Sequence, residues 1–245
     1  MIKCDELAKI FEKHDLTFFT GVPDSTFKGW MSFLDENELD NRIVVNEGDG
    51  IHHAGAYHIS TGKFGVVYMQ NAGLGNIVNP LTSYADKEVY SLPMLLMIGW
   101  RGEPGVKDEP QHKKMGRITT NLLDALEIPY EFLSYKIEEA EKSIEKAVGF
   151  MKDNNEPFAL VVRKNVMEDY NGKEISQEYE MLREEALTVI ADNLDEDDVI
   201  VSTTGKTSRE LFEYRESMNQ GHERDFLNVG GMGGASSQGL EIALQ

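Results

Sequence analysis

The chain has 245 residues, enough for one large domain or one and a half ordinary ones, and its 40% hydrophobic and 27% charged residues are typical of a soluble globular protein. Its net charge of -19 argues against nucleic acid as a partner, because phosphate backbones require clustered Lys and Arg. No apolar run is long enough to cross a membrane, and the lone Cys4 excludes an internal disulfide. The first residues lack an apolar stretch, so we expect no leader segment and a cytoplasmic protein.

Apolar strands alternate with amphipathic helices through the first two-thirds of the chain. We expect helices at 4–14, 25–36, 47–61 and 137–151, a further helix after Gly75, strands at 16–20, 42–46, 64–69, 93–99 and 158–162, and a polar loop at 100–115. This alternation predicts a doubly wound parallel sheet covered by helices on both faces. Ligands of such a sheet lie beyond the carboxyl ends of the strands, where we expect the loops at 21–25, 46–50, 70–76 and 99–116 to gather.

Polar residues between 163 and 177 indicate a linker between two domains. The alternation then restarts, with a helix expected at 178–193, strands at 199–202 and 226–229, a helix from about Thr207, and a glycine-rich turn into a last helix. Two strands are too few for a stable domain. The sequence therefore predicts an α/β fold with a first domain over 1–170 and the start of a second, incomplete α/β domain over 178–245.

Glu47 follows a predicted strand and opens a predicted helix. An acidic residue in a first helical turn is also favoured by ordinary capping, so this position alone leaves both interpretations open. His52, His53 and His58 share the same helix. Their spacing does not match the usual i, i+4 zinc pair, so we predict no metal site from them.

The polar loop and the turn after it carry six groups that are cationic or can become so: Arg101, Lys107, His112, Lys113, Lys114 and Arg117. Such a cluster in an acidic protein suits a carboxylate or phosphonate, which Arg can hold with two parallel hydrogen bonds. A solvated basic loop, balanced by neighbouring acidic residues, is an equally open interpretation.

Two glycine-containing segments lie in the second predicted domain. Gly205-Lys206-Thr207 is no P-loop, because Ile200 stands where that motif requires glycine, but its backbone N–H groups could still hold a phosphate. The run 230–234 carries Met232 at its centre, and so much glycine indicates a close approach of the backbone to another group. An ordinary turn from strand to helix would explain the first segment, and a close contact between a helix and a strand would explain the second.

Four motifs, in this order, resemble those of the thiamine-diphosphate enzymes: GVPDS at 21–25, NEGDG at 46–50, QNAGLGN at 70–76 and GGMG at 230–233. Within that group the chain is similar to the phosphonopyruvate and sulfopyruvate decarboxylases, over essentially its whole length. The resemblance implies the thiamine-diphosphate-binding fold, with a pyrimidine-binding domain followed by a diphosphate-binding domain.

The resemblance also implies roles for single residues. Glu47 would hydrogen-bond the pyrimidine ring as a catalytic residue, the carbonyl of Gly230 would receive the ring's amino group, and Met232 would support the bent cofactor. His112 corresponds to one of two histidines in related enzymes and is the second catalytic candidate. The remaining cofactor-binding candidates are Gln70, Asn71, Gly73, Gly205 and Thr207, and the substrate-binding candidates are Asp24, Ser25, Arg101 and Lys113.

The reaction implied by the resemblance is decarboxylation of 3-phosphonopyruvate to phosphonoacetaldehyde and CO2, as in the biosynthesis of 2-aminoethylphosphonate-type compounds. A sulfopyruvate decarboxylase and a non-catalytic truncated fragment are the alternatives. The family binds diphosphate through Mg2+, whose ligands we expect beyond Gln245, so we expect no metal ligand in this chain. The family's shared active sites imply a homodimer or a larger assembly.

Overall fold

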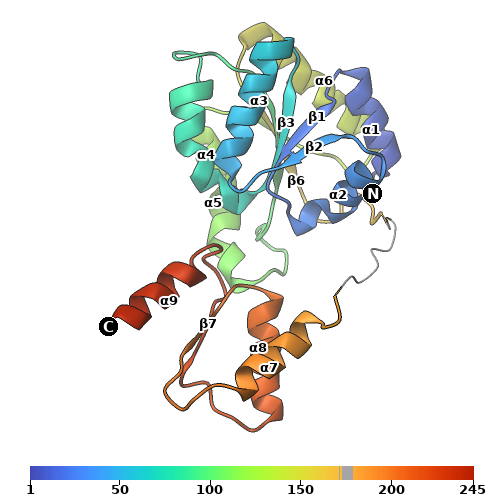
Figure 1. The fold of residues 1–245 in the computed structure, drawn as a ribbon. Helices are drawn as coiled ribbons and strands as arrows, with labels where there is room; N and C mark the ends of the chain where they lie inside the picture. The colour runs from blue at the N-terminus through green and yellow to red at the C-terminus, as the bar shows by residue number, and fades with distance from the viewer. Residues whose placement is uncertain (171, 173–178) are drawn as a thin grey trace. The chain divides into compact units, whose positions relative to one another are not determined.

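The computed structural model describes residues 1–170, 172 and 179–245 (Figure 1). The chain divides into two compact units, Met1–Lys173 and Glu174–Gln245, and each is described by itself. Part of the expected linker (171 and 173–177) and residue 178, the first of the helix expected at 178–193, lie outside the described residues. None of the described helices is both long and apolar enough to cross a membrane.

The first unit is built on a six-stranded sheet in the order β2-β1-β3-β4-β6-β5. Every neighbouring pair of strands runs parallel. The strands are β1 (Phe18–Gly21), β2 (Asp40–Ile43), β3 (Gly65–Gln70), β4 (Leu95–Gly99), β5 (Tyr130–Phe132) and β6 (Phe158–Val162). Strands β4 and β6 are buried along their whole length, as expected for a parallel sheet covered on both faces. The doubly wound α/β fold is thereby confirmed.

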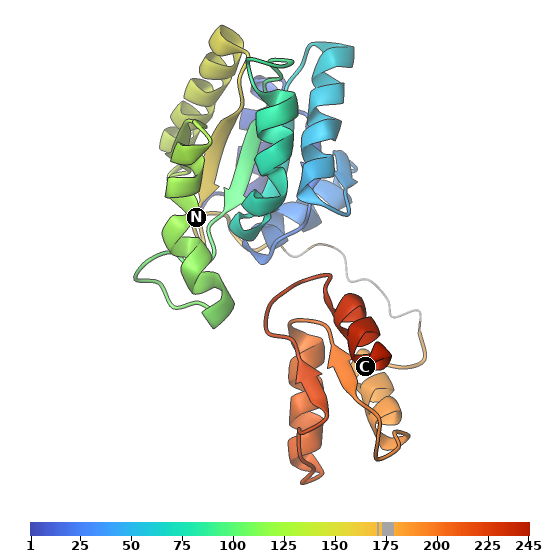
Figure 2. The same ribbon diagram turned by 90° about the vertical axis from the view of Figure 1, so that its left-hand side faces the viewer.

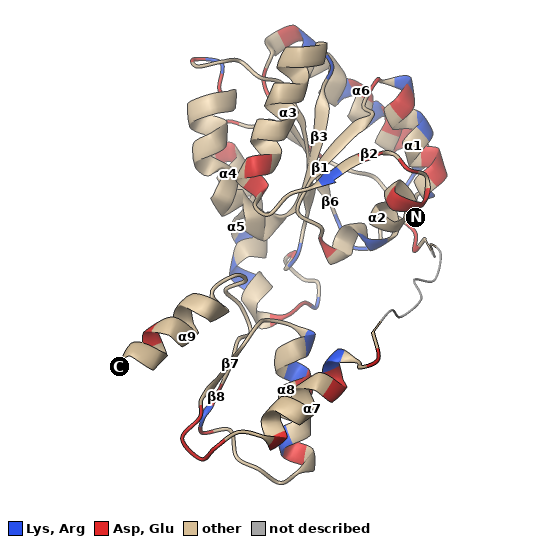
Figure 3. Ribbon diagram, viewed as in Figure 1, with Lys and Arg blue, Asp and Glu red and all other residues tan. Residues whose placement is uncertain are grey.

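Helices cover both faces of this sheet (Figures 1 and 2). One face packs against α1 (Cys4–Lys13), α2 (Lys28–Glu36) and α6 (Ile137–Asn154), and the other against α3 (Glu47–Thr61), α4 (Leu74–Pro80) and α5 (Lys113–Ala125). Successive side chains of a strand point to opposite faces of the sheet. The neighbouring Val66 and Val67 accordingly belong to different core clusters. Figure 3 shows β1 and β3 free of charged residues, whereas the edge strand β2 carries Asp40 and Arg42.

Three parts of the first unit differ from the expectation, and one of them is β5, which was not predicted. The polar loop expected at 100–115 is shorter, because the 3-10 helix η4 (Pro110–His112) and α5 begin inside it. The strand expected at 42–46 is β2, which pairs with β1 from Asp40 to Ile43. Residue Asn46 instead caps α3.

The second unit contains a pair of parallel strands, β7 (Ile200–Ser202) and β8 (Asp225–Leu227). Its helices, within residues 179–245, are α7 (Arg183–Asp192), α8 (Lys206–Ser217) and α9 (Ala235–Leu244). Of these residues only Ala191 and Leu211 are buried hydrophobic ones. The second unit is therefore a partial α/β layer, as the sequence predicts.

Candidate active site

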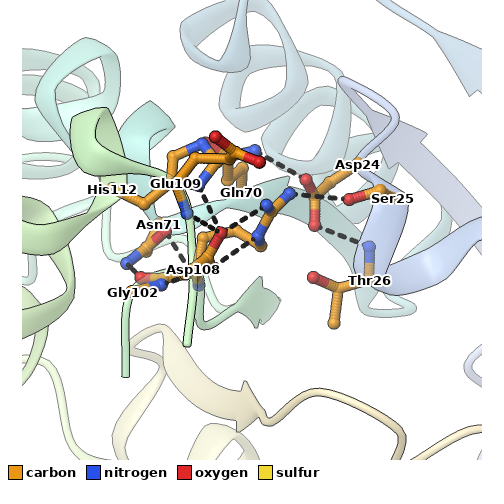
Figure 4. A network of polar contacts seen from close by, with 10 residues as sticks. Asp24, Ser25, Thr26, Gln70, Asn71, Gly102, Asp108, Glu109 and His112 are labelled. Carbon is orange, nitrogen blue, oxygen red and sulfur yellow. Dashed lines mark hydrogen bonds and ion pairs between the residues drawn. The ribbon is translucent and has the colours of Figure 1, made fainter. Parts of the chain in front are cut away.

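Parallel strands place the loops that follow them at one edge of the sheet. In the first unit these loops are joined by hydrogen bonds between residues far apart in the sequence (Figure 4). They come from the segments after β1, β3 and β4. The carboxyl edge of the sheet therefore brings together five of the candidate residues: Asp24, Ser25, Gln70, Asn71 and Arg101.

Glu47 is the first residue of α3, and its side chain is buried, with the residue 6% exposed. The cap of this helix is provided by Asn46, whose Oδ1 accepts a hydrogen bond from the Gly48 backbone N–H at 2.7 Å. Asn76 Nδ2 donates to Glu47 Oε2 at 2.7 Å. Because Asn46 caps the helix, the burial of Glu47 is not explained by capping.

Gly73 leaves the space that the Glu47 carboxyl occupies. A Cβ at Gly73 would lie 2.6 Å from Oε1, Cγ and Cδ of Glu47, closer than atoms of neighbouring side chains approach. The glycine belongs to the 3-10 helix η2 (Asn71–Gly73), directly after β3. The backbone after β3 therefore packs tightly against the carboxyl group.

Asp24 joins the loops after β1 and β3. It is 8% exposed, and its Oδ1 accepts a hydrogen bond from the Thr26 backbone N–H at 2.9 Å, which caps η1 (Ser25–Phe27). Its Oδ2 accepts from Gln70 Nε2 at 2.6 Å. Both bonds are visible in Figure 4.

Asn71 connects the loop after β3 with the loop after β4. It is buried, and its Nδ2 donates to the Arg101 carbonyl at 2.8 Å and to Thr119 Oγ1 at 2.8 Å. Its Oδ1 accepts from the Arg101 backbone N–H at 3.2 Å. A single buried amide thus fixes the position of Arg101 relative to η2 and Gly73.

Asp108 lies in the middle of the network in Figure 4. Arg101 donates to both of its oxygens, from Nε at 2.9 Å and from Nη2 at 2.6 Å, while His112 Nδ1 lies 2.9 Å from Oδ1. The Arg101 guanidinium holds the pKa of the Asp108 carboxyl far below its ordinary value, and that pairing raises the pKa of Arg101. Arg101 Nη1 also donates to Ser25 Oγ at 2.8 Å.

A cavity of about 290 Å³ opens beside Ser25 and Arg101. Lys28 and Lys164 also line it, and sequence reasoning missed both. Their positions in the sequence could have identified them, because Lys28 lies just after the loop that follows β1 and Lys164 lies just after β6. The remaining lining residues include three acidic ones, so the cavity carries both signs of charge: Asp108, Glu168 and Asp169.

The structure does not bring every cation of the basic segment to this cavity. Lys113 is exposed at the first turn of α5 and is not among the cavity's lining residues. His112 ends η4, and its side chain is 14% exposed. Of the substrate-binding candidates, Ser25 and Arg101 line the cavity, whereas Asp24 does not and instead accepts hydrogen bonds from Gln70 and Thr26.

The other candidates lie in the second unit, at the ends of its two strands. Gly205 has φ +85° and precedes α8, in which Thr207 is half-buried. Gly230 and Met232 follow β8, and Met232 is 70% exposed in a turn with positive φ at Gly231 and Gly233. Asn228 Nδ2 ties these segments together by donating to the Ser202 carbonyl at 2.7 Å and to Gln238 Oε1 at 2.9 Å.

Backbone N–H groups at Gly205 and in the 230–234 turn could hold phosphate oxygens. Among the residues that the structure describes, no group of three or more His, Cys, Asp or Glu side chains could hold a metal ion.

Residues 4–126 match the protein family described as "Thiamine pyrophosphate enzyme, N-terminal TPP binding domain". A phosphonopyruvate decarboxylase of Streptomyces viridochromogenes is 31% identical over 94% of this chain and 60% of its own. A sulfopyruvate decarboxylase subunit alpha of Methanococcus maripaludis is 32% identical over 59% of this chain and 84% of its own. This chain spans 59–60% of the length of the phosphonopyruvate decarboxylases that it matches.

Among solved structures, a Mycobacterium smegmatis protein proposed to be a thiamin diphosphate-dependent enzyme has a TM-score of 0.50 at 15% identity. The likeness covers 84% of this chain and 40% of that one, and it concerns the fold alone.

Proposed function

Because this chain belongs to the thiamine pyrophosphate enzymes, in the family of the phosphonopyruvate and sulfopyruvate decarboxylases, we propose that it serves in the thiamine-diphosphate-dependent decarboxylation of a 2-oxoacid. The substrate that we propose is 3-phosphonopyruvate, which would give phosphonoacetaldehyde and CO2 for 2-aminoethylphosphonate-type biosynthesis. One observation carries this choice: the similarity to a phosphonopyruvate decarboxylase covers 94% of the chain and therefore extends through both units.

The residues around Glu47 fit the pyrimidine part of the cofactor. A buried carboxyl that does not cap its helix can accept a hydrogen bond from a ring nitrogen or donate a proton to it. Gly73 allows the carboxyl and the backbone of η2 to lie in contact, and Asn76 orients the carboxyl through Oε2. When bound, thiamine diphosphate supplies the electron sink for the loss of CO2. We assign Glu47 the task of holding a proton at the pyrimidine ring.

For the rest of the cofactor, we propose the strand ends of the second unit. The N–H groups at Gly205 and Thr207 open α8, where the helix dipole favours a diphosphate. Gly230 and the exposed Met232 would contact the rings. We propose Mg2+ as the ion that accompanies the diphosphate.

The cavity beside Ser25 suits the anionic end of the substrate. Arg101 Nη1 donates to Ser25 Oγ at 2.8 Å, and Lys28 and Lys164 add positive charge to a wall that also carries Asp108, Glu168 and Asp169. We propose that Ser25 and Arg101 bind this end directly. Asp24 would keep their loop in place, Lys113 would attract the anion from the exposed end of α5, and His112 would transfer a proton.

Sulfopyruvate is the second candidate substrate, favoured by the 32% identity to a sulfopyruvate decarboxylase subunit alpha. That relative matches 59% of this chain, whereas the phosphonopyruvate decarboxylase matches 94%, so a chain that continues into a second unit favours the phosphonate. The name of that relative describes one subunit of an assembly. We propose a cytoplasmic homodimer or larger assembly for this chain.

Product analysis tests the proposed function. The purified holoenzyme would be supplied with thiamine diphosphate, Mg2+ and either 3-phosphonopyruvate or sulfopyruvate, and the aldehyde formed would be identified by NMR. We expect phosphonoacetaldehyde as the preferred product, with turnover lost in Glu47→Gln. Preference for sulfopyruvate would replace the substrate assignment, and no turnover of either would reject the proposed function.

A further inference from the structure

Asp108 is the residue on which the loop after β4 converges. Its carboxylate accepts from Arg101 Nε and Nη2 and from the backbone N–H groups of Gly102 and Glu109, each of the latter at 2.8 Å. His112 Nδ1 completes the set at 2.9 Å. A carboxylate with donors on both oxygens has little freedom to move, so it can serve as a fixed point for the two side chains that touch it.

The hydrogen bond to His112 defines the state of the imidazole. Arg101 keeps the pKa of Asp108 far below its ordinary value, so the carboxylate stays ionised and can only accept hydrogen bonds. His112 Nδ1 must therefore carry a proton. When the ring is neutral, Nε2 is then the nitrogen that accepts a proton, and the side chain is 14% exposed.

The same carboxylate sets the direction of Arg101. Two guanidinium nitrogens face Asp108, and Nη1 donates to Ser25 Oγ at the wall of the cavity. The Arg101 backbone is fixed separately by Asn71. With its backbone and two of its nitrogens held, Arg101 presents Nη1 to the cavity without having to be ordered when an anion binds.

We propose that Asp108 is a positioning residue, which fixes His112 as the Nδ1–H tautomer with Nε2 unprotonated and directs Arg101 Nη1 toward the Ser25 cavity. The value of this arrangement for decarboxylation rests on the proposed function. The arrangement itself is a property of the first unit. Asp108 acts through its neighbours and has no contact with the reacting atoms in this proposal.

The tautomer test uses the chain with 15N-labelled histidine, with the His112 signals assigned by their loss in His112→Gln. We expect an unprotonated Nε2 and a protonated Nδ1 in the unaltered protein at a pH where the ring is neutral. In Asp108→Asn the two nitrogen shifts should move toward the values of a mixed population. A protonated Nε2 in the unaltered chain, or unchanged shifts in Asp108→Asn, would overturn the proposal.

Steady-state kinetics of the holoenzyme supply the second readout. In Asp108→Asn we expect KM for the 2-oxoacid to rise on the order of tenfold, because Arg101 is no longer held by a charged partner. We also expect kcat to fall, because His112 loses its fixed tautomer. A merely structural role would reduce the amount of folded enzyme and leave the KM of the folded fraction unchanged, which would count against the proposal.

Glu103→Gln is the matched control. Glu103 lies on the same loop and pairs with Arg163 at 3.0 Å, so this change also removes one negative charge but leaves the contacts of Asp108 in place. We expect the His112 tautomer and KM to stay as in the unaltered protein. If the tautomer result holds but neither substrate is turned over, the proposed function fails and the structural role of Asp108 stands.

Discussion

At the scale of single residues, Glu47 stands out because its buried carboxyl is not needed to cap α3. Asn46 caps α3, and the Glu47 carboxyl is buried against Gly73 with Asn76 on Oε2. We predict that Glu47→Gln lowers kcat by about 10²–10⁴-fold, because the amide cannot exchange a proton with the pyrimidine ring. The affinity for thiamine diphosphate should change little, and calorimetric titration beside initial-rate kinetics measures both.

Asp49→Asn provides the control for this prediction. Asp49 lies in the same first turn of α3 and is exposed. Its substitution therefore also removes a negative charge near the N-terminus of the helix, but leaves the buried carboxyl of Glu47 unchanged. Turnover in this variant should remain near that of the unaltered enzyme. Unchanged turnover in Glu47→Gln would remove Glu47 from the mechanism.

From the pairing of Asp108 with Arg101 we predict that part of the protein's stability is lost in acid. Its pKa is lowered in the folded protein by Arg101, so the ionised carboxylate stabilises the fold above the ordinary value of 3.8, and this contribution is lost as the pH falls below that value. Asp108→Asn should cost about 1–3 kcal/mol at neutral pH, and the difference should shrink under acid. Urea unfolding at a series of pH values measures it.

The exposed pair of Glu141 and Lys13 serves as the comparison. Glu141→Gln removes a carboxylate on the surface, where solvent screens the interaction, and should change stability much less than Asp108→Asn does. An effect of the same size in both variants, independent of pH, would contradict the role of Asp108.

At the scale of elements, the sequence predicted β6 and α3 correctly, misplaced β2 and missed α5. Strand β6 and helix α3 lie where the pattern placed them, at 158–162 and 47–61. Helix α5 is amphipathic, but its first turn lies within the basic segment 100–117, which we interpreted from the sequence as a loop, and so the helix was missed. Strand β2 is mostly exposed and carries Asp40, Asn41 and Arg42, so tertiary pairing with β1 decides its position.

The two glycines around η2 and α4 give the sharpest prediction at this scale. A Cβ at Gly73 would lie 2.6 Å from the Glu47 side chain, so Gly73→Ala should displace the carboxyl, reduce turnover and cost about 1–3 kcal/mol of stability. Gly75 has no neighbour within 4 Å of such an atom and lies inside α4. Gly75→Ala should therefore leave turnover intact and stabilise the protein by up to about 1 kcal/mol, as thermal unfolding and rate assays would show.

At the scale of the whole molecule, the sequence predicted that the loops meet at one sheet edge but not which side chains touch. Parallel strands alone bring together the segments after β1, β3 and β4. The bond from Arg101 to Ser25 spans 76 positions, and Asn71 meets Thr119 across 48. Such contacts depend on strand register and on the course of the loop, which carry no local sequence signal.

The two units differ in how many hydrophobic residues they bury, and we therefore predict different stabilities for them. The first unit has two extensive apolar clusters, whereas in residues 179–245 only Ala191 and Leu211 are buried hydrophobic residues. Since apolar burial is the main favourable contribution to folding, we expect the second unit to unfold first.

The two tryptophans make this difference measurable, because Trp30 and Trp100 both lie in the first unit. Their fluorescence reports that unit alone, while far-UV circular dichroism reports the helices of both units. With increasing urea, the circular dichroism change should therefore begin before the tryptophan change. Coincident transitions would mean that the two units unfold together, and that the second unit is stabilised by contacts beyond its own core.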